Sequence, residues 1–253
     1  MPELPEVETI RRDLEPYLVG KSITAAYIHS GAERLAITHP PRQLEQELCG
    51  QLINKLSRHG KYLIASLSDG RFWVIHLRMT GMLLIGSLHT ATGRFERARV
   101  ELDNGTALLF NDIRKFGTWH LVTSPYDAMP NIGPDTLSKE FSIASLAKAL
   151  SRRSTPIKSA LLDQRIAAGI GNIYADEALW IAKIHPRTSA NKIGRRRVTR
   201  LHKAIIKALC DGLGDRGSSF DVYRDAFGKS GGHHLKVHVF RRHDEPCERL
   251  SCA

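Results

Sequence analysis

The chain has 253 residues, 42% hydrophobic and 25% charged, with 37 Lys and Arg against 26 Asp and Glu for a net charge of +11. This composition excludes a fibrous or largely disordered chain, and no apolar run approaches the roughly 20 residues of a membrane-spanning helix. Four cysteines are too few for a disulfide scaffold of this size, so we expect a reducing, cytoplasmic location of the bacterial kind, at the nucleoid if DNA is the partner.

The first segment predicts a helix. Val7, Ile10, Leu14 and Leu18 recur at helical spacing, and Gly20 follows as a stop. The string MPELPEVETI also has acids where a secretory signal has bases, and it lacks an apolar core, so we expect no export signal.

The next hundred residues predict an antiparallel sheet. They mix apolar runs with alternation, and Asp69-Gly70 and Asn104-Gly105 are hairpin-turn dipeptides because both tolerate a positive φ. We expect a β-sandwich with the first helix attached to it.

The second half of the chain predicts helices. Two prolines and a glycine in 126–140, with Pro125 just before them, indicate a linker. The helices are expected over 142–152, 156–166, 172–183 and 194–213, and the strand-like run LKVHVF follows in the tail at 235–240.

Charge is concentrated in this half. Residues 1–148 hold 17 basic and 16 acidic side chains, whereas 149–253 hold 20 and 10. The asymmetry favours a polyanion partner, nucleic acid above all, although a solvated basic face without a partner is the alternative.

The N-terminus carries groups that suit nucleophilic catalysis. If the initiator Met is removed, Pro2 presents a secondary amine, which titrates near neutral pH and attacks sugar aldehydes to form a Schiff base. The resulting iminium cannot lose its charge by deprotonation, so it draws electrons strongly. Glu3 and Glu6 lie beside it, as acid–base chemistry requires. The alternative is an ordinary proline in a first helical turn.

Several strings together carry a resemblance. They are MPELPEVETIRR, HGKYLI, HLRMTGML, NDIRKFGTW and LLDQRIAAGIGNIYADEALW. With these strings in this order, residues 1–242 closely resemble the formamidopyrimidine-DNA glycosylase family. Members of that family are bifunctional base-excision repair enzymes. The resemblance implies an α+β fold, with an N-terminal antiparallel β-sandwich behind a leading helix and then a helix–two-turn–helix domain. We place these parts at 1–125 and 142–232, with a linker at 126–141 and a truncated zinc-finger region at 233–253.

The resemblance implies three catalytic residues. Pro2 corresponds to the nucleophile that attacks the anomeric carbon, and Glu3 to the acid that assists opening of the sugar ring. Lys61 corresponds to a lysine that binds phosphate and stabilises the departing charge. Without the resemblance, Lys61 would be an ordinary surface lysine on a strand.

Three further residues correspond to those that fill the gap left by a flipped nucleotide. Met79 and Phe116 would replace lost stacking, and Arg114 would hydrogen-bond the orphaned base, typically cytosine. From their own pattern, Met79 and Phe116 would be ordinary core residues.

The string GIGNIYADEALW corresponds to the helix–two-turn–helix motif. Gly169 and Gly171 would let the backbone approach a phosphate, the helix N-terminus would bind it, and Asn172 would donate a hydrogen bond. Lys158 corresponds to a lysine near the lesion pocket. Residues 218–234, here called the cover loop, correspond to the mobile segment over the flipped base.

The tail departs from the family pattern. Cys247 and Cys252 are separated by four residues instead of two, and no second pair follows, so the zinc expected in the family has an incomplete ligand set. The hairpin arginine of the family's finger is also absent. A different site built with His233, His234, His238 and His243 is the alternative. We expect no metal or other cofactor.

These observations predict a monomeric DNA glycosylase and abasic-site lyase that acts on oxidised purines in double-stranded DNA. Two alternatives stay open. One is a weakly active or non-catalytic protein that binds lesions or abasic sites. The other is an endonuclease VIII-like enzyme specific for oxidised pyrimidines.

Overall fold

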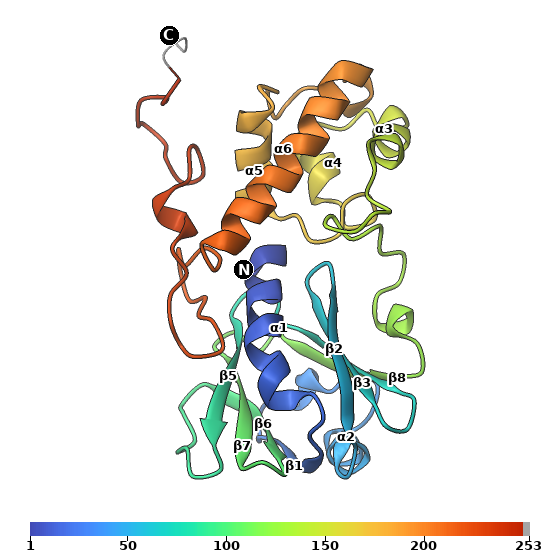
Figure 1. The fold of residues 1–253 in the computed structure, drawn as a ribbon, viewed down its shortest axis with the longest axis vertical. Coiled ribbons are helices and arrows are strands. Elements are labelled where there is room, and N and C mark those ends of the chain that lie inside the picture. The colour runs from blue at the N-terminus through green and yellow to red at the C-terminus, as the bar shows by residue number, and fades with distance from the viewer. Residues whose placement is uncertain (250–253) are drawn as a thin grey trace.

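The computed structural model describes residues 1–249, and these form two lobes with the N-terminus between them (Figure 1). The lower lobe contains two four-stranded antiparallel sheets. The first has the order β1-β6-β7-β5, and the second has the order β2-β3-β4-β8. Their bounds are β1 Ile23–Ile28, β2 Ile53–His59, β3 Tyr62–Leu67, β4 Phe72–His76, β5 Gly81–Ser87, β6 Glu96–Leu102, β7 Thr106–Asp112 and β8 Thr118–Val122.

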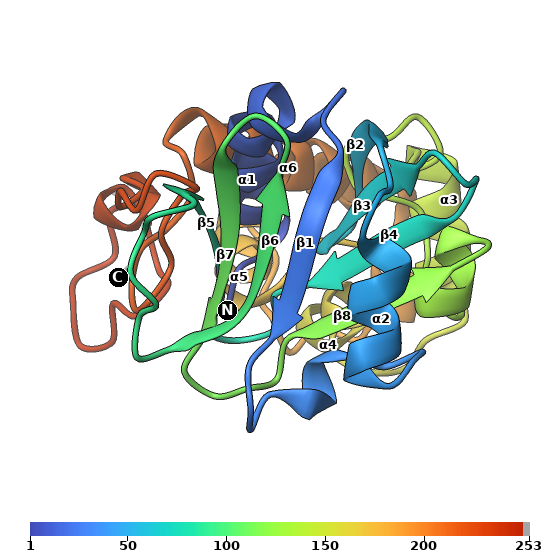
Figure 2. The same ribbon diagram turned by 90° about the horizontal axis from the view of Figure 1, so that it is seen from below.

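The two sheets face one another around a shared apolar core, as seen from below in Figure 2. Trp73 of β4 and Trp119 of β8 pack edge to face with ring centroids 4.8 Å apart, and Phe110 of β7 lies 5.7 Å from Trp119. The alternating apolar pattern therefore produces the predicted sandwich. Turns occupy both predicted hairpin dipeptides.

Helix α1 (Leu4–Leu18) begins with Glu3 and Glu6 in a capping box. Val7 and Ile10 belong to the sandwich core, whereas Leu4 belongs to the core of the helical lobe. One helix thus contributes to both hydrophobic cores and joins the two lobes.

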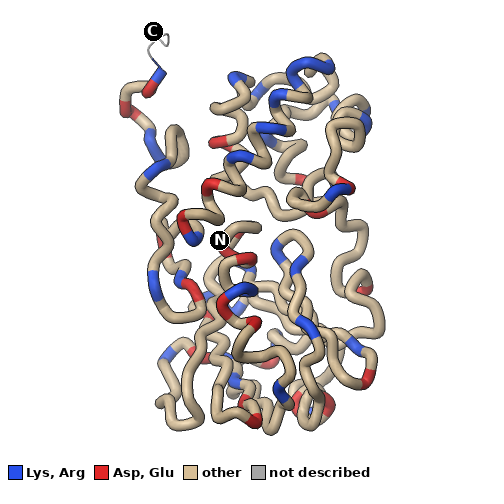
Figure 3. The backbone as a smooth tube through the Cα atoms, in the orientation of Figure 1, with Lys and Arg blue, Asp and Glu red and all other residues tan. Residues whose placement is uncertain are grey.

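The upper lobe contains α3 (Ile143–Ser151), α4 (Ile157–Leu162), α5 (Asn172–Ile181) and α6 (Arg195–Gly214). Helix α6 buries a stripe of apolar residues against α5, as its period predicts. Lys and Arg recur along α6 (Figure 3), and most of them are exposed: Arg195, Arg196, Arg200, Lys203 and Lys207. The predicted α+β class and its two parts are confirmed.

Three local predictions are wrong. The run 235–240 forms no strand, because the backbone N–H groups of 238–240 donate to the carboxylate of Glu177 instead of to a neighbouring strand. A short helix, α2 (Pro41–Leu48), interrupts the region predicted as sheet and buries only Leu44 and Leu48. Helix α4 ends at Leu162, four residues before the predicted end.

Short 3-10 turns lie at Glu33–Leu35, Pro125–Ala128, Ala190–Lys192 and His233–Leu235. Within the described part of the chain, no helix combines the length and the apolar character that crossing a membrane requires.

Candidate active site

A cavity of about 500 Å³ lies between the two lobes. Its walls come from the N-terminus, the β2–β3 turn, the end of β4, the linker and the turn before α5. Met1, Lys61, Met79 and Asn172 line it, and so do His76 and Arg78. Pro2, the next residue after Met1, is buried. The fold therefore brings together residues that the sequence spreads over 170 positions.

Glu3 is a buried acid of this site, with 2% of its surface exposed. Its carboxylate accepts hydrogen bonds from the backbone N–H groups of Gly171 at 2.7 Å and Ile173 at 2.9 Å, at the positive end of α5. Burial nevertheless raises the pKa of Glu3 to about 7, against the opposing effect of the Lys61 ammonium and these N–H donors. Glu3 can therefore hold or release a proton near neutral pH.

The start of α5 departs from the prediction. We expected its N-terminus and the flanking glycines to receive a phosphate, but the carboxylate of Glu3 already occupies these N–H groups. A Cβ on Gly171 would lie 2.3 Å from Cδ of Glu3, and one on Gly169, whose φ is +107°, would lie 2.5 Å from the Leu4 side chain. These glycines admit the chain's own N-terminus.

Lys61 lies at the tip of the β2–β3 hairpin and is only 6% exposed. The preceding Gly60 has a φ of 58°, and its N–H donates to Asp135 of the linker at 2.7 Å, which fixes the turn against the helical lobe. Burial lowers the pKa of the Lys61 ammonium, while the carboxylates of Glu3 and Glu6 oppose the shift. The alternative of an ordinary surface lysine is wrong.

Glu6 connects three elements. Its carboxylate accepts hydrogen bonds from the backbone N–H of Glu3, from the Tyr174 hydroxyl of α5 and from the backbone N–H of Ser218, each at 2.8 Å. From its place in the sequence, Glu6 had only a general association with acid–base chemistry. Its contacts show that it holds the N-terminus, α5 and the start of the cover loop together.

His76 is a residue of this cavity that the sequence analysis did not single out. Burial, with the nearby charges of Arg78 and Lys61, lowers the pKa of His76 to about 3, so its ring is neutral at pH 7. Nδ1 accepts the backbone N–H of Arg78 at 2.9 Å, which leaves the ring proton on Nε2 as a donor. Its position in the string HLRMTGML was the available signal.

Met79, Arg114 and Phe116 gather at one exposed place. Met79 is 42% and Phe116 49% exposed, so their assignment to an ordinary core is wrong. The Arg114 guanidinium donates to Sδ of Met79 at 3.0 Å and lies 4.7 Å from the ring centroid of Phe116. Exposed apolar side chains around a cation suit stacking and hydrogen bonding to an unpaired base.

A buried carboxylate fixes the backbone that carries Arg114 and Phe116. Asp112, which has no exposed surface, accepts the backbone N–H groups of Arg114 at 3.1 Å and Phe116 at 2.8 Å. Arg78 and Lys115, which precede Met79 and Phe116, have φ values of 54° and 58°. Such left-handed conformations are costly for these residue types and indicate that the two apolar side chains are held outward.

The remaining predicted residues lie apart from one another. Asn172 is exposed at the cavity wall. Lys158 of α4 donates to Asp176 of α5 at 2.8 Å and is not among the residues that line the cavity.

The tail does not fit a zinc site in its described part. Within residues 1–249, no three His, Cys, Asp or Glu side chains are grouped to hold a metal ion. His233 hydrogen-bonds to Asp215 at 3.0 Å, and His238 stacks on Trp180. Cys247 lies in the tail, and Cys252 lies outside the described residues.

Comparison with known proteins identifies the family. A model of the formamidopyrimidine-DNA glycosylase N-terminal domain matches residues 1–119, and a model of that family's H2TH domain matches residues 132–223. The chain belongs to the formamidopyrimidine-DNA glycosylase family. A member from Herpetosiphon aurantiacus is 42% identical over 251 residues, covering 98% of this chain and 92% of the relative. One from Desulforamulus reducens is 43% identical, covering 98% and 90%.

Solved structures of this glycosylase family have the same fold. The Lactococcus lactis Fpg in complex with DNA containing an abasic site has a TM-score of 0.89 at 35% identity, with 98% of this chain and 91% of that chain covered. The same protein with DNA containing Fapy-dG has a TM-score of 0.89 at 34% identity, with the same coverage.

Proposed function

We propose that this chain is a bifunctional DNA glycosylase and abasic-site lyase of base-excision repair, which removes 8-oxoguanine and formamidopyrimidines from double-stranded DNA. One observation carries the proposal. Lys61, which is buried, lines the cavity between the two lobes and lies close enough to Glu3 for its charge to oppose the rise of the Glu3 pKa to about 7, and Glu3 directly follows Pro2 in the chain. The DNA complexes of its Lactococcus relative support the choice of substrate.

The first chemical step uses the N-terminal amine. After removal of Met1, the nitrogen of Pro2 would attack C1′ of the damaged nucleotide. The N–C1′ bond forms, the bond from C1′ to the base breaks, and the base leaves with a proton. Glu3 then gives its proton to the sugar ring oxygen, the ring opens, and a positively charged iminium links Pro2 to C1′.

The iminium makes strand cutting possible. It accepts the electron pair left when C2′ loses a proton, and the 3′ phosphate departs. Loss of a proton from C4′ then expels the 5′ phosphate, and water hydrolyses the remaining iminium, which breaks the N–C1′ bond and frees Pro2. Lys61, Arg78 and the Nε2–H of His76 would stabilise the phosphate charges, because all three line the cavity.

The exposed group at the cavity edge suits DNA distortion. Met79 and Phe116 would enter the space of a flipped nucleotide, and Arg114 would hydrogen-bond the orphaned base. Asn172 would donate to a phosphate from the cavity wall. The basic side of α6 adds the electrostatic attraction that any duplex requires.

Borohydride trapping tests the proposal. Protein is incubated with a duplex carrying 8-oxoguanine opposite cytosine, and the expected result is a covalent band whose attachment maps to Pro2. Pro2→Gly and Glu3→Gln should abolish the band. DNA binding without any band on the 8-oxoguanine or the abasic duplex would favour the non-catalytic alternative, and a band only on a thymine glycol duplex would favour the oxidised-pyrimidine alternative.

A further inference from the structure

Arg241 of the C-terminal tail and Asp221 of the cover loop form a two-pronged ion pair. The two guanidinium nitrogens Nη1 and Nη2 donate to the two carboxylate oxygens at 3.0 and 2.9 Å. Both side chains are about half exposed, so the pair adds little to global stability. Its parallel geometry, however, fixes the orientation of one segment against the other.

Two aromatic rings support this pair. Phe220, beside Asp221, and Phe240, beside Arg241, pack edge to face with centroids 5.0 Å apart. The Arg241 guanidinium lies 5.3 Å from the first ring and 5.9 Å from the second. Both rings also pack against the core of the helical lobe. The two rings therefore hold the ion pair against the core of the helical lobe.

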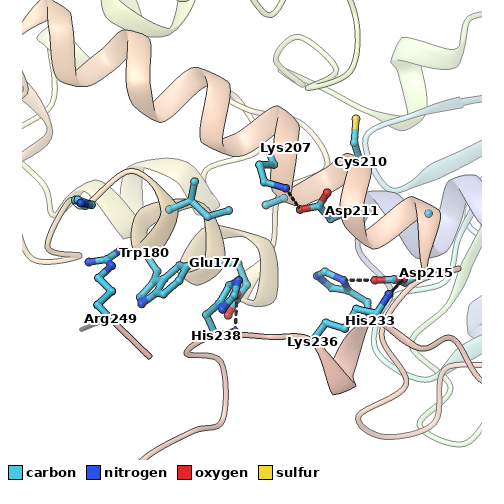
Figure 4. A pocket seen from close by; sticks show the side chains of 14 residues that line it. Glu177, Trp180, Lys207, Cys210, Asp211, Asp215, His233, Lys236, His238 and Arg249 are labelled. Carbon is cyan, nitrogen blue, oxygen red and sulfur yellow. Dashed lines mark hydrogen bonds and ion pairs between the residues drawn. The ribbon is translucent and has the colours of Figure 1, made fainter. Parts of the chain in front are cut away.

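The tail is bound firmly to α5 just before Arg241. Glu177, 3% exposed, accepts the backbone N–H groups of His238, Val239 and Phe240 at 2.8, 2.9 and 3.1 Å. One turn later Trp180 stacks on the His238 ring, with centroids 3.9 Å apart, and Figure 4 shows Glu177 and Trp180 facing the tail at this point. Arg241 thus projects from an anchored stretch of chain.

The cover loop is attached to the sandwich at its middle. Ile85 of β5 donates its backbone N–H to the carbonyl of Ala226 at 2.9 Å, and Ala226 is fully buried in the sandwich core. The carboxylate of Asp225, which is 1% exposed, accepts a hydrogen bond from the Arg216 guanidinium. Asp221 lies between this anchor and the helical lobe, near enough to the N-terminal ammonium for that charge, after Arg241, to lower the pKa of its carboxyl.

We propose that Arg241 is a positioning residue that, through Asp221, holds the cover loop beside the N-terminus, at the edge of the substrate cavity. The tail anchored on α5 thereby sets how long the loop stays over a flipped base. The inference rests on the proposed function and deepens it. Because only base removal has a base to cover, the ion pair serves excision, and cleavage at an abasic site formed beforehand does not need it.

The first test needs no activity. Hydrogen exchange of residues 217–232 is measured on the DNA-free protein for wild type, Arg241→Ala, Asp221→Ala and the charge swap Arg241→Asp with Asp221→Arg. We expect roughly two- to fivefold faster exchange in both single variants, the size of an exposed ion pair, and recovery in the swap. Aspartate tolerates the left-handed backbone of position 241, whose φ is 60°. Unchanged exchange in both single variants would overturn the proposal.

The second test separates positioning from general damage. Single-turnover rates are measured on an 8-oxoguanine duplex and on a duplex with a preformed abasic site. In both single variants the single-turnover rate should fall several-fold on the first duplex and stay unchanged on the second. The swap should restore the rate on the first duplex. Arg71→Ala is the matched control, since Arg71 also forms ion pairs at the surface, with Glu47 and Asp69, but in the β3–β4 turn of the sandwich.

Equal losses on both duplexes, or no recovery in the swap, would contradict the role of the pair. A wild-type protein inactive on both duplexes would instead refute the proposed function, and the exchange measurement would still decide whether Arg241 holds the loop.

Discussion

The carboxylate of Glu3 accepts a 2.7 Å hydrogen bond from the backbone N–H of Gly171, which lies 168 positions further along the chain. The two residues approach so closely that a Cβ on Gly171 would lie 2.3 Å from Cδ of Glu3. The position of the acid is therefore set by the helical lobe, although the acid itself belongs to the N-terminal string.

We expect Gly171→Ala to displace Glu3, and to lower the free energy of unfolding by about 1–3 kcal/mol and base excision by at least tenfold. Urea unfolding and single-turnover excision measure the two effects. Gly214→Ala is the control, because Gly214 ends α6 with nothing within 4 Å of its Cβ position. A Gly171→Ala protein as stable and active as wild type would show that this close contact is not required.

The pKa of Glu3 predicts a pH-dependent stability. It rises from 4.5 in the unfolded chain to about 7 in the folded protein, so the folded state binds this proton more tightly. The contribution of this proton to the free energy of unfolding is complete below pH 4.5 and is lost as the pH rises from 4.5 to 7. It amounts to about 3 kcal/mol at most.

Glu3→Gln removes this titration. Relative to wild type, the variant should gain free energy of unfolding between pH 5 and pH 8, as measured by urea unfolding at both values. A constant difference between the two proteins across this range would contradict a raised pKa.

Exposure separates two phenylalanines that are six positions apart. Phe116→Ala should leave the free energy of unfolding within about 0.5 kcal/mol of wild type and weaken binding to lesion DNA by about 1–3 kcal/mol, since its ring is half exposed. Phe110→Ala, whose ring is 1% exposed, should cost about 3–5 kcal/mol of stability. Fluorescence anisotropy and thermal unfolding measure these effects. Similar stability losses in both would place Phe116 in the core.

Arg78 lines the cavity and should contact a phosphate. Arg78→Gln should then reduce the slope of log affinity against log salt concentration by about one, because each neutralised phosphate contributes about 0.9. Titrations at several salt concentrations measure the slope. Arg71→Gln, in the distant β3–β4 turn, should leave it unchanged, and an equal change in both variants would indicate only a net-charge effect.

Regular periodicity made much of the fold predictable. The stripe of Val7, Ile10 and Leu14 and the Asn104-Gly105 turn depend on local chemistry, and the structure has both. The run 235–240 failed for a non-local reason, since its alternation is strand-like but Glu177 takes up its N–H groups. Neither the period nor the composition of a segment shows such a distant acceptor.

The site was less predictable from residue patterns alone. Lys61 has the local pattern of a surface lysine, and only the contact of its turn with Asp135 of the linker explains its burial. Met79 and Phe116 have the composition of core residues, yet the backbone contacts of Asp112 present Phe116 to solvent. The resemblance to a family supplied these residues, because tertiary contacts and an external partner determine their exposure.

Because Leu4 belongs to the helical core and Val7 to the sandwich core, α1 cannot complete its packing until both lobes exist. During synthesis the N-terminus leaves the ribosome first, but residues 171–174, which receive Glu3, follow about 10–30 s later at 5–20 residues per second. The end of the chain that carries the proposed nucleophile is thus made first and assembled last. A nascent or truncated chain that lacks α5 carries the N-terminal amine without its acid partner in place, so this order of assembly couples chemical competence to completion of the chain.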